Sequence, residues 1–331
     1  MRHLLSLRAT DAADIRRILE TAAAFKEILE RPVKKTPTLR GRSVVTLFYE
    51  PSTRTRTSFE LAAKIMSAEA VNISVAQSSV TKGESLKDTL LTLQSLTADC
   101  LVMRHPSSGA AELAARYVHV PVINAGDGCH EHPTQALLDI LTIWEHKVVG
   151  REDDTYPRAL STEHAFDLTG LTVAIVGDVA HSRVARSNLW GLTRLGASVR
   201  WIGPSTLLPP DARRLPVTVY TDLRDGIRGA DVVMALRLQT ERMEKGLLPS
   251  VREYARNWCI TPEALKSAKP DVLVMHPGPM NRGVEISSEV ADGAGGIRAA
   301  MNRQVTNGVA VRMACLYLLM GSRITQSEVA E

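Results

Sequence analysis

The chain has 331 residues, of which 44% are hydrophobic and 23% charged, a composition typical of a globular protein and long enough for two domains. Its net charge of +4 is too small to indicate nucleic-acid binding, although a mild basic excess suits small anionic substrates. The sequence shows no membrane-span-like apolar stretch and no signal-peptide core at its N-terminus. Four scattered cysteines without metal-ligand spacing predict no structural zinc and a reducing, cytoplasmic setting.

The first half of the chain alternates short β-rich runs with helical patterns. These runs are almost continuously apolar, which is typical of parallel strands covered on both faces by helices. The predicted strands span residues 43–50, 70–76, 99–106 and 120–126. A helix is predicted to begin around Pro133, because proline is favoured in a first helical turn.

The second half repeats this alternation after a polar stretch at 149–166, which is a candidate linker. Five further strands are predicted at 171–178, 198–204, 217–222, 231–236 and 271–279. The sequence therefore predicts an α/β fold of two doubly wound parallel-sheet domains linked by interdomain helices. We expect the domains at 1–148 and 149–301, with a C-terminal helix at 302–321 packing back on the first.

Polar and charged residues directly follow many of the predicted strands. The segments are "EPSTRTR", "RHP", "GDGCHEHPTQ", "GDVAHSR", "LRLQTER" and "HPGPMNR". In doubly wound sheets, ligands bind beyond the carboxyl ends of the strands. The clustering therefore predicts a binding site built from these segments.

The stretch from Ser52 to Thr57 places four hydroxyl and two guanidinium side chains where a predicted strand turns into a predicted helix. Ser52 is placed to cap that helix, whose first N–H groups are free and carry partial positive charge. With Arg54 beside it, the turn predicts a phosphate site. The alternative is an ordinary capped helix with solvated arginines.

Three motifs together resemble the aspartate and ornithine carbamoyltransferase family. They are "STRTR" at 52–56, "HPTQ" at 132–135 and "HPGP" at 276–279, in the family's order and spread over nearly the whole chain. The resemblance implies a carbamoyl phosphate-binding domain at 1–148 and an aspartate-binding domain at 149–301. It also implies that the phosphate is bound by Ser52, Thr53, Arg54 and Thr55.

The amino acid that accepts the carbamoyl group is indicated by other segments. The "HCLP" and "SMG" segments usual in ornithine enzymes are absent, whereas "LRLQ" resembles a segment of the aspartate enzymes. The resemblance implies that Arg237 and Gln239 bind one aspartate carboxylate and that Arg183 binds the other. Judged alone, Arg183 is equally an ordinary solvated helix arginine, and Arg237 a surface ion pair.

The resemblance also implies how the carbonyl group of carbamoyl phosphate is polarised. Thr55, Arg104 and His132 point donors at its oxygen, and Gln135 orients the amide. The catalytic set is then Arg54, Thr55, Arg104 and His132. A histidine at a helix N-terminus has its cationic form disfavoured and can donate as a neutral ring. For an isolated histidine, the alternative is a helix cap or a core residue.

Backbone carbonyls of Gly278 and Pro279 are implied to bind the carbamoyl nitrogen and the attacking amine. Many aspartate enzymes have leucine where this chain has Gly278, which supplies the same carbonyl on a freer backbone. We expect function to be retained. The family needs no metal, cofactor or covalent enzyme intermediate, and its leaving phosphate takes up the proton.

The polar loop "QSSVTKGESLKDT" at 77–89 resembles a loop that the family inserts into the active site of a neighbouring subunit. The resemblance assigns Ser78 and Lys82 to the neighbour's phosphate, with Lys82 also near aspartate, and implies a homotrimer with shared sites. A regulatory chain or a dihydroorotase is a possible further partner. The alternative for the loop is a flexible polar surface segment.

The activity so implied is transfer of the carbamoyl group to L-aspartate, which gives N-carbamoyl-L-aspartate and phosphate in de novo pyrimidine biosynthesis. One alternative is a carbamoyltransferase for another amino acid such as ornithine. A second is a non-catalytic scaffold, and a third is a nucleotide-binding protein, which the missing GxGxxG in "VGDVAHSRVA" disfavours.

Overall fold

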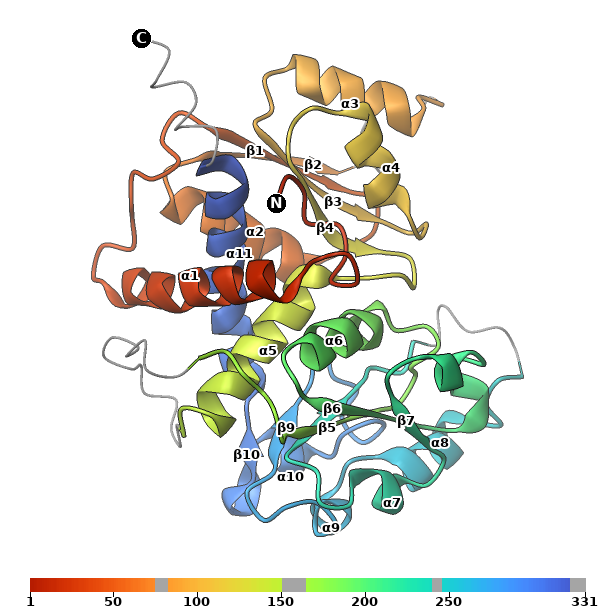
Figure 1. The fold of residues 1–331 in the computed structure, drawn as a ribbon. Helices are drawn as coiled ribbons and strands as arrows, with labels where there is room; N and C mark the ends of the chain where they lie inside the picture. The colour runs from red at the N-terminus through yellow and green to blue at the C-terminus, as the bar shows by residue number, and fades with distance from the viewer. Residues whose placement is uncertain (75–82, 151–164, 240–245, 322–331) are drawn as a thin grey trace. The chain divides into compact units, whose positions relative to one another are not determined.

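The computed structural model describes residues 1–74, 83–150, 165–239 and 246–321 (Figure 1). The chain divides into two compact units, each built on its own parallel sheet. Within the described residues, the first comprises Met1–Leu137 and the chain from Thr306 to Gly321, and the second comprises the chain from Leu138 to Val305. This architecture confirms the predicted α/β fold of two parallel-sheet domains.

The sheet of the first unit has four parallel strands in the order β2-β1-β3-β4. They are β1 (Ser43–Phe48), β2 (Glu69–Ser74), β3 (Cys100–His105) and β4 (Val122–Asp127). β1 and β3 lie within runs predicted from the sequence, and β2 and β4 overlap such runs, each extending one residue beyond them. Because the strands are parallel, all four carboxyl ends lie at one edge of the sheet.

Helices cover both faces of this sheet (Figure 1). The helices of the unit are α1 (Ala12–Glu30), α2 (Thr53–Ile65), α3 (Leu86–Ser95), α4 (Ala110–Tyr117), the start of α5 (Pro133–Lys147) and most of α11 (Met301–Gly321). α3 and α4 bury Leu90, Leu93 and Ala114 against one face of the sheet. Figure 1 shows α1, α2 and α11 on its other side.

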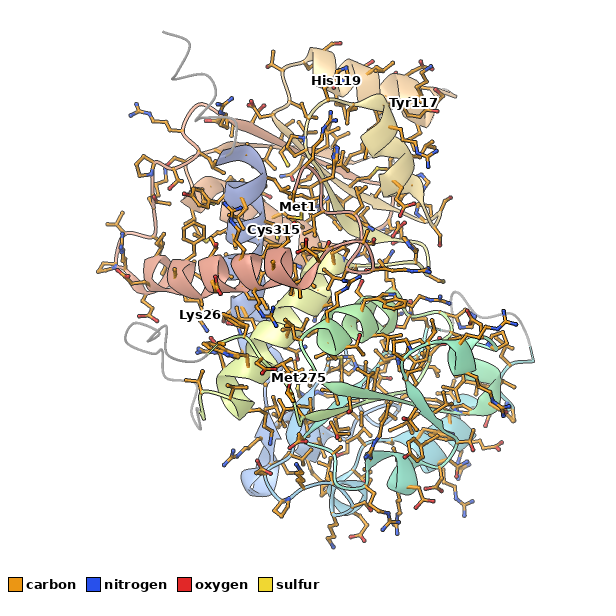
Figure 2. All side chains as sticks on the ribbon, viewed as in Figure 1. Met1, Lys26, Tyr117, His119, Met275 and Cys315 are labelled. Carbon is orange, nitrogen blue, oxygen red and sulfur yellow. The ribbon has the colours of Figure 1, made fainter. Side chains whose placement is uncertain are left out.

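Two helices in this unit contact each other through buried side chains. The ammonium of Lys26 on α1, labelled in Figure 2, is buried and donates to Oδ1 of Asn307 on α11 at 2.8 Å. The rings of Phe25 and Tyr317 meet edge-on at 5.5 Å between centroids. α11 also reaches α2, where the Arg312 guanidinium lies 5.2 Å from the centre of the Phe59 ring.

The N-terminal segment extends the sheet beyond β4. Leu4 pairs with β4 in parallel, its N–H bonding to the Val122 carbonyl at 2.9 Å and its carbonyl accepting from the Asn124 N–H at 2.9 Å. The next N–H groups, of Leu7 and Arg8, donate to the buried carboxylate of Glu131 at 2.7 and 3.1 Å. The start of the chain is thereby bonded to the loop that leads into α5.

The sheet of the second unit has six parallel strands in the order β10-β9-β8-β5-β6-β7. They are β5 (Thr172–Val176), β6 (Ser198–Ile202), β7 (Thr218–Tyr220), β8 (Val232–Ala235), β9 (Leu273–Met275) and β10 (Arg298–Ala299). The first five fall within predicted runs. β10 was not predicted, because two residues carry no periodicity of their own.

The helices of the second unit are α6 (Arg183–Arg194), α7 (Leu223–Ile227), α8 (Val251–Trp258), α9 (Pro262–Leu265) and α10 (Ser288–Ala291). Helices α7, α9 and α10 bury Ile227, Leu265 and Val290 in a core with the sheet. α8 lies in the segment between β8 and β9. No helix among the described residues is long and apolar enough to cross a membrane.

The division between the units falls inside helices rather than between them. It cuts α5 between Leu137 and Leu138, and α11 between Val305 and Thr306. The sequence placed the boundary after residue 148, at the end of the α5 run. α5 is buried along nearly its whole length, and its residues are divided between the two units. A boundary inside a continuous helix leaves no break in the sequence pattern.

Two glycines allow close backbone contact at the carboxyl ends of β5 and β6. Gly177 follows β5 with φ +128°, and its N–H bonds to the Ile202 carbonyl at 2.8 Å. A Cβ on Gly203 would lie 2.6 Å from the Gly177 carbonyl oxygen. That neighbour is backbone and cannot rotate away, so glycine is required at Gly203.

We expect Gly203→Ala to destabilise the protein by about 1–3 kcal/mol, because an added methyl group in a filled space forces the backbone to shift. The measurement is the urea midpoint of the purified variant. Gly321→Ala is the matched control, since its Cβ would meet only ordinary contacts of 3.6 Å. Equal midpoints for the two variants would contradict the steric requirement.

Candidate active site

In the first unit, the predicted carbamoyl phosphate residues follow three neighbouring strands at one edge of the sheet. Ser52 to Thr55 follow β1, Arg104 lies at the end of β3, and His132 and Gln135 follow β4. Phe48 on β1 pairs with Arg104 on β3, which puts the two strand ends in register. The structure thus gathers these residues from positions far apart in the sequence.

The N-terminus of α2 begins at Thr53, with Ser52 at the cap position as predicted. The Ser52 side chain makes no capping hydrogen bond within the described part of the chain. Thr53 and Arg54 are exposed, whereas Thr55 is buried. The exposed first turn leaves backbone donors, a cation and hydroxyl groups accessible to an anion.

Arg104 is held in place by Glu50, a residue that the sequence analysis did not single out. Its Nε donates to Oε2 of Glu50 at 3.1 Å, and both side chains are largely buried. The Arg104 carbonyl accepts from the Tyr49 N–H at 2.9 Å. One edge of the guanidinium is thus fixed by a carboxylate two residues beyond β1. The feature of the sequence that could have revealed Glu50 is its position as an acidic residue directly before "PST".

His132 stands at the start of α5 and is buried, with only 4% of its surface exposed. Its carbonyl accepts from the Gln135 N–H at 3.0 Å, which closes the first turn of the helix. Gln135 is also buried. Both alternatives for His132, a cap and a buried histidine, describe its setting correctly, and neither excludes contact with a ligand.

A network of buried polar groups shapes the loop that presents His132. Asp127 Oδ1 accepts from Asn124 Nδ2 at 2.7 Å and from the Glu131 N–H at 3.2 Å. Its other oxygen accepts from the Gly109 N–H at 2.6 Å and bonds to Nδ1 of His130 at 3.1 Å. The single carboxylate of Asp127 therefore fixes both ends of the loop.

The charges in this loop shift each other's pKa values. Burial alone favours the neutral carboxyl of Asp127, but the hydrogen bonds from His130, Asn124 and Gly109 outweigh it and lower the pKa of Asp127. The hydrogen bond to Asp127 raises the pKa of His130, against the effect of its partial burial. Both shifts favour the charged forms, so His130 and Asp127 favour an ion pair.

In the second unit, the predicted aspartate residues also follow neighbouring strands. Arg183 opens α6 after β5, Arg237 and Gln239 follow β8, and Gly278 and Pro279 follow β9. Strands β9, β8 and β5 are adjacent in the sheet, so their carboxyl ends meet at one edge. Arg183 is 5% exposed and is therefore no solvated surface arginine.

Asp178, directly after β5, joins two of these segments. Its Oδ1 bonds to Nδ1 of His181 at 2.8 Å, and the His181 carbonyl accepts from Gln239 Nε2 at 3.2 Å. Burial raises the pKa of Asp178, although hydrogen bonds from His181 and from the Gln239 backbone oppose the shift. Asp178 therefore couples the segment before α6 to the segment after β8.

A second buried network connects α6 to the "HPGP" segment. Asp139 on α5 accepts from Asn188 of α6 at 2.8 Å and from Gln304 of α11 at 2.7 Å. Gln304 in turn accepts from the His276 N–H at 3.0 Å. All four residues are buried. Neither Asp139 nor Gln304 stood out in the sequence, because Asp139 lies within an apolar helical run and Gln304 among other polar residues at the start of α11.

Two predicted site residues, Ser78 and Lys82, lie outside the described residues, and so does most of the candidate linker at 149–166. Within the ranges that the structure does describe, no group of three or more His, Cys, Asp or Glu residues is arranged to hold a metal ion.

Replacing His130 with glutamine should remove a pH-dependent contribution to stability. Because the folded pKa of His130 is raised, its ion pair stabilises the fold fully below the ordinary histidine pKa of about 6.5. That contribution is lost as pH rises through the raised folded value. Urea denaturation across this range should therefore show the wild-type advantage over His130→Gln shrinking with pH.

His119→Gln, which alters an exposed histidine in the same unit, is the control. An advantage over His130→Gln that stays constant with pH would show that the pair is not charged.

Family models match both parts of the chain. Residues 2–145 match the aspartate/ornithine carbamoyltransferase carbamoyl-P binding domain, and residues 169–319 match the Asp/Orn binding domain of the same family. Proteins named aspartate carbamoyltransferase catalytic subunit are close in sequence. That of Moorella thermoacetica is 56% identical over 96% of this chain and 97% of its own length, and that of Heliobacterium modesticaldum is 58% identical over 96% and 95%.

Solved structures agree with the sequence relatives. Aspartate transcarbamoylase from Trypanosoma cruzi, in complex with carbamoyl phosphate and aspartate, matches with a TM-score of 0.81 and 32% identity over 96% of both chains. Ornithine carbamoyltransferase from Pyrococcus furiosus matches with a TM-score of 0.82 and 29% identity over 97% of both chains. The two matched domains, the full-length relatives and the motifs at both strand edges agree: the chain belongs to the aspartate/ornithine carbamoyltransferase family.

Proposed function

We propose that this chain is an enzyme that transfers the carbamoyl group of carbamoyl phosphate to L-aspartate, forming N-carbamoyl-L-aspartate and phosphate. The observation that carries the proposal is the buried Arg183 beside the Arg237–Gln239 segment, at an edge suited to a dicarboxylate. The full-length relatives named for this activity support it. The product is an intermediate of de novo pyrimidine biosynthesis.

The phosphate of the first substrate binds at the N-terminus of α2. Ser52, Thr53 and Thr55 donate hydroxyl hydrogen bonds, and the first-turn N–H groups add partial positive charge. The exposed Arg54 supplies a planar two-pronged cation for the phosphate oxygens. As phosphate leaves, its growing negative charge strengthens these contacts, which lowers the barrier rather than only tightening binding.

The carbonyl oxygen of carbamoyl phosphate lies among Thr55, Arg104 and His132. Arg104 contributes without reorganising, because Glu50 already holds its Nε. His132 donates as a neutral ring at the start of α5, and Gln135 one turn into the helix orients the carbamoyl amide. Together these donors stabilise the oxyanion of the tetrahedral intermediate.

Aspartate binds to the second unit. Arg183 takes one carboxylate, and Arg237 with Gln239 takes the other, since guanidinium groups bind carboxylates through two parallel hydrogen bonds. The carbonyls of Gly278 and Pro279 accept from the attacking amine and the carbamoyl nitrogen. The amine then attacks the carbonyl carbon, the tetrahedral intermediate expels phosphate, and the departing phosphate takes up the amine proton. Positioning and charge stabilisation carry the rate enhancement.

The assembly is a homotrimer with active sites shared between chains. Ser78 and Lys82 reach the phosphate of a neighbouring site, and Lys82 also approaches aspartate. Carbamoyl phosphate carries about two negative charges near neutral pH, as phosphomonoesters do, so a further cation is useful. A regulatory chain or dihydroorotase completes a larger assembly in this proposal. All four cysteines are free, which suits action in the cytoplasm.

One test of the proposed function concerns the amino acid that accepts the carbamoyl group. The purified chain with carbamoyl phosphate should release phosphate and form N-carbamoyl-L-aspartate, and ornithine should not replace aspartate. Arg237→Ala should impair aspartate use by about 2–5 kcal/mol, because a buried carboxylate loses its charged partner. Turnover of ornithine alone would establish the other branch of the family, and no turnover of any acceptor would indicate a non-catalytic scaffold.

The second prediction concerns shared sites. Arg54→Ala and Lys82→Ala should each be inactive alone, because every site then lacks one ligand. In a mixed trimer one interface joins an intact Arg54 to an intact Lys82, so random reassembly should restore about a quarter of the wild-type activity. Subunit exchange confirmed by mass without recovered activity would place both residues in one chain's site.

A further inference from the structure

His276 begins the "HPGP" turn, and the proposed function uses only the carbonyls of Gly278 and Pro279 from this turn. Its side chain is nevertheless completely buried, at 0% exposure, and so is that of Glu285, at 1%. The two side chains meet, with His276 Nε2 lying 3.3 Å from Glu285 Oε1. A buried polar pair that is not itself a ligand needs another explanation.

A neighbouring hydrogen bond determines the protonation of His276. The backbone N–H of Gly278 donates to its Nδ1 at 2.8 Å. An accepting nitrogen carries a lone pair and no hydrogen, so the ring is neutral and its hydrogen is on Nε2. Nε2–H then donates to Glu285, and the contact is a hydrogen bond to a carboxylate rather than an ion pair.

The same carboxylate oxygen also holds the far end of the turn. Glu285 Oε1 accepts from the Asn281 N–H at 2.5 Å. One oxygen therefore bonds to the ring that fixes Gly278 and to the backbone that follows Pro279. Gly278 has φ +67°, a conformation that costs little for glycine but is not specified by it. The conformation of the turn must therefore be fixed by contacts with other groups, and the hydrogen bonds of His276 and Glu285 provide them.

The backbone of His276 is fixed independently. Its N–H donates to Gln304 Oε1 at 3.0 Å, and Gln304 bonds to Asp139, which also holds Asn188 of α6. The ring is therefore attached to a rigid buried network at its base and to Glu285 at its tip. The polar groups near the pair are backbone N–H groups, this network, and the side chains of Tyr254 and Cys259, whose pKa values are raised by burial and further by the charge of Glu285.

Resting on the proposed function, we propose that His276 and Glu285 are positioning residues. The Glu285 carboxylate holds the neutral His276 ring through its Nε2–H, and the ring in turn orients the carbonyls of Gly278 and Pro279 toward the incoming amine. As the bond from the amine to the carbonyl carbon forms, the amine nitrogen gains positive charge, and these carbonyl oxygens stabilise it. Their misplacement therefore weakens the transition state more than the bound ground state.

Four variants separate this role from general stability. His276→Asn keeps an acceptor oxygen near the position of Nδ1 but loses Glu285, whereas His276→Gln reaches the position of Nε2 but loses Gly278. Glu285→Ala removes the carboxylate, and Glu285→Gln keeps one acceptor oxygen. Asp292→Asn is the matched control, because it breaks an exposed ion pair with Arg282 in the same segment of the chain.

We expect Glu285→Ala and both His276 variants to lower kcat on the order of 100-fold, the cost of a misplacement of about 1 Å. KM for carbamoyl phosphate should change little, since its phosphate is bound in the other unit. Glu285→Gln should recover much of the activity, and Asp292→Asn should behave as wild type. Losses in KM alone, or losses that track the melting temperature across the variants, would overturn the positioning role.

A measurement without substrate tests the pair separately from the proposed function. Nitrogen-15 NMR of histidine-labelled protein should show His276 as a neutral ring protonated at Nε2, and Glu285→Ala should perturb that signal. A ring protonated at Nδ1 or at both nitrogens would overturn the inference even in an active enzyme. If the protein used no aspartate but the NMR result held, the proposed function and the positioning of the amine would fail, whereas the neutral His276 ring held by Glu285 would stand.

Discussion

Parallel pairing of neighbouring strands is the constraint on which both candidate sites depend. Because Phe48 of β1 lies opposite Arg104 of β3, the turn into α2 and the guanidinium of Arg104 emerge at the same edge. In the second unit, Val176 pairs with Ala235, so the segments that carry Arg183 and Arg237 also emerge together. A slip of one residue in either register would turn every side chain to the opposite face of its sheet. The hydrogen bonds that pair the strands therefore also fix the relative positions of the candidate site residues.

The sequence was sufficient to locate nine strands of the described chain, and its motifs marked the candidate ligand residues, because both leave local signals. Seven strands lie within predicted runs and two more overlap them, since buried parallel strands are continuous apolar segments. Family motifs marked Arg54, His132 and Gly278. The supporting residues were not found, because Glu50, Asp139 and Glu285 act on partners 54, 165 and 9 residues away, respectively. The division between the units runs inside continuous helices, which leave no break in the sequence pattern.

Buried charge recurs in both units, and its contribution is geometric more than energetic. Glu145 on α5 and Arg303 on α11 form an almost fully buried pair at 3.0 Å. Removing two charges from water offsets most of their attraction, so such a pair adds little net stability but strongly disfavours other arrangements. Asp127, Asp139 and Asp178 follow the same logic, each bonded to donors from separate segments. Such pairs suit loops that must hold several binding groups at fixed distances, because they disfavour other loop conformations.

The N-terminal segment protects the edge of the first sheet from pairing with other polypeptides. An uncovered terminal strand offers a row of free backbone groups to any extended chain, and such rows seed edge-to-edge aggregation. Leu4 occupies this position on β4, and the bonds of Leu7 and Arg8 to Glu131 fasten the covering segment. A protease that trimmed the first few residues would therefore expose a ladder able to recruit other polypeptides, and would do so beside the loop that carries His132.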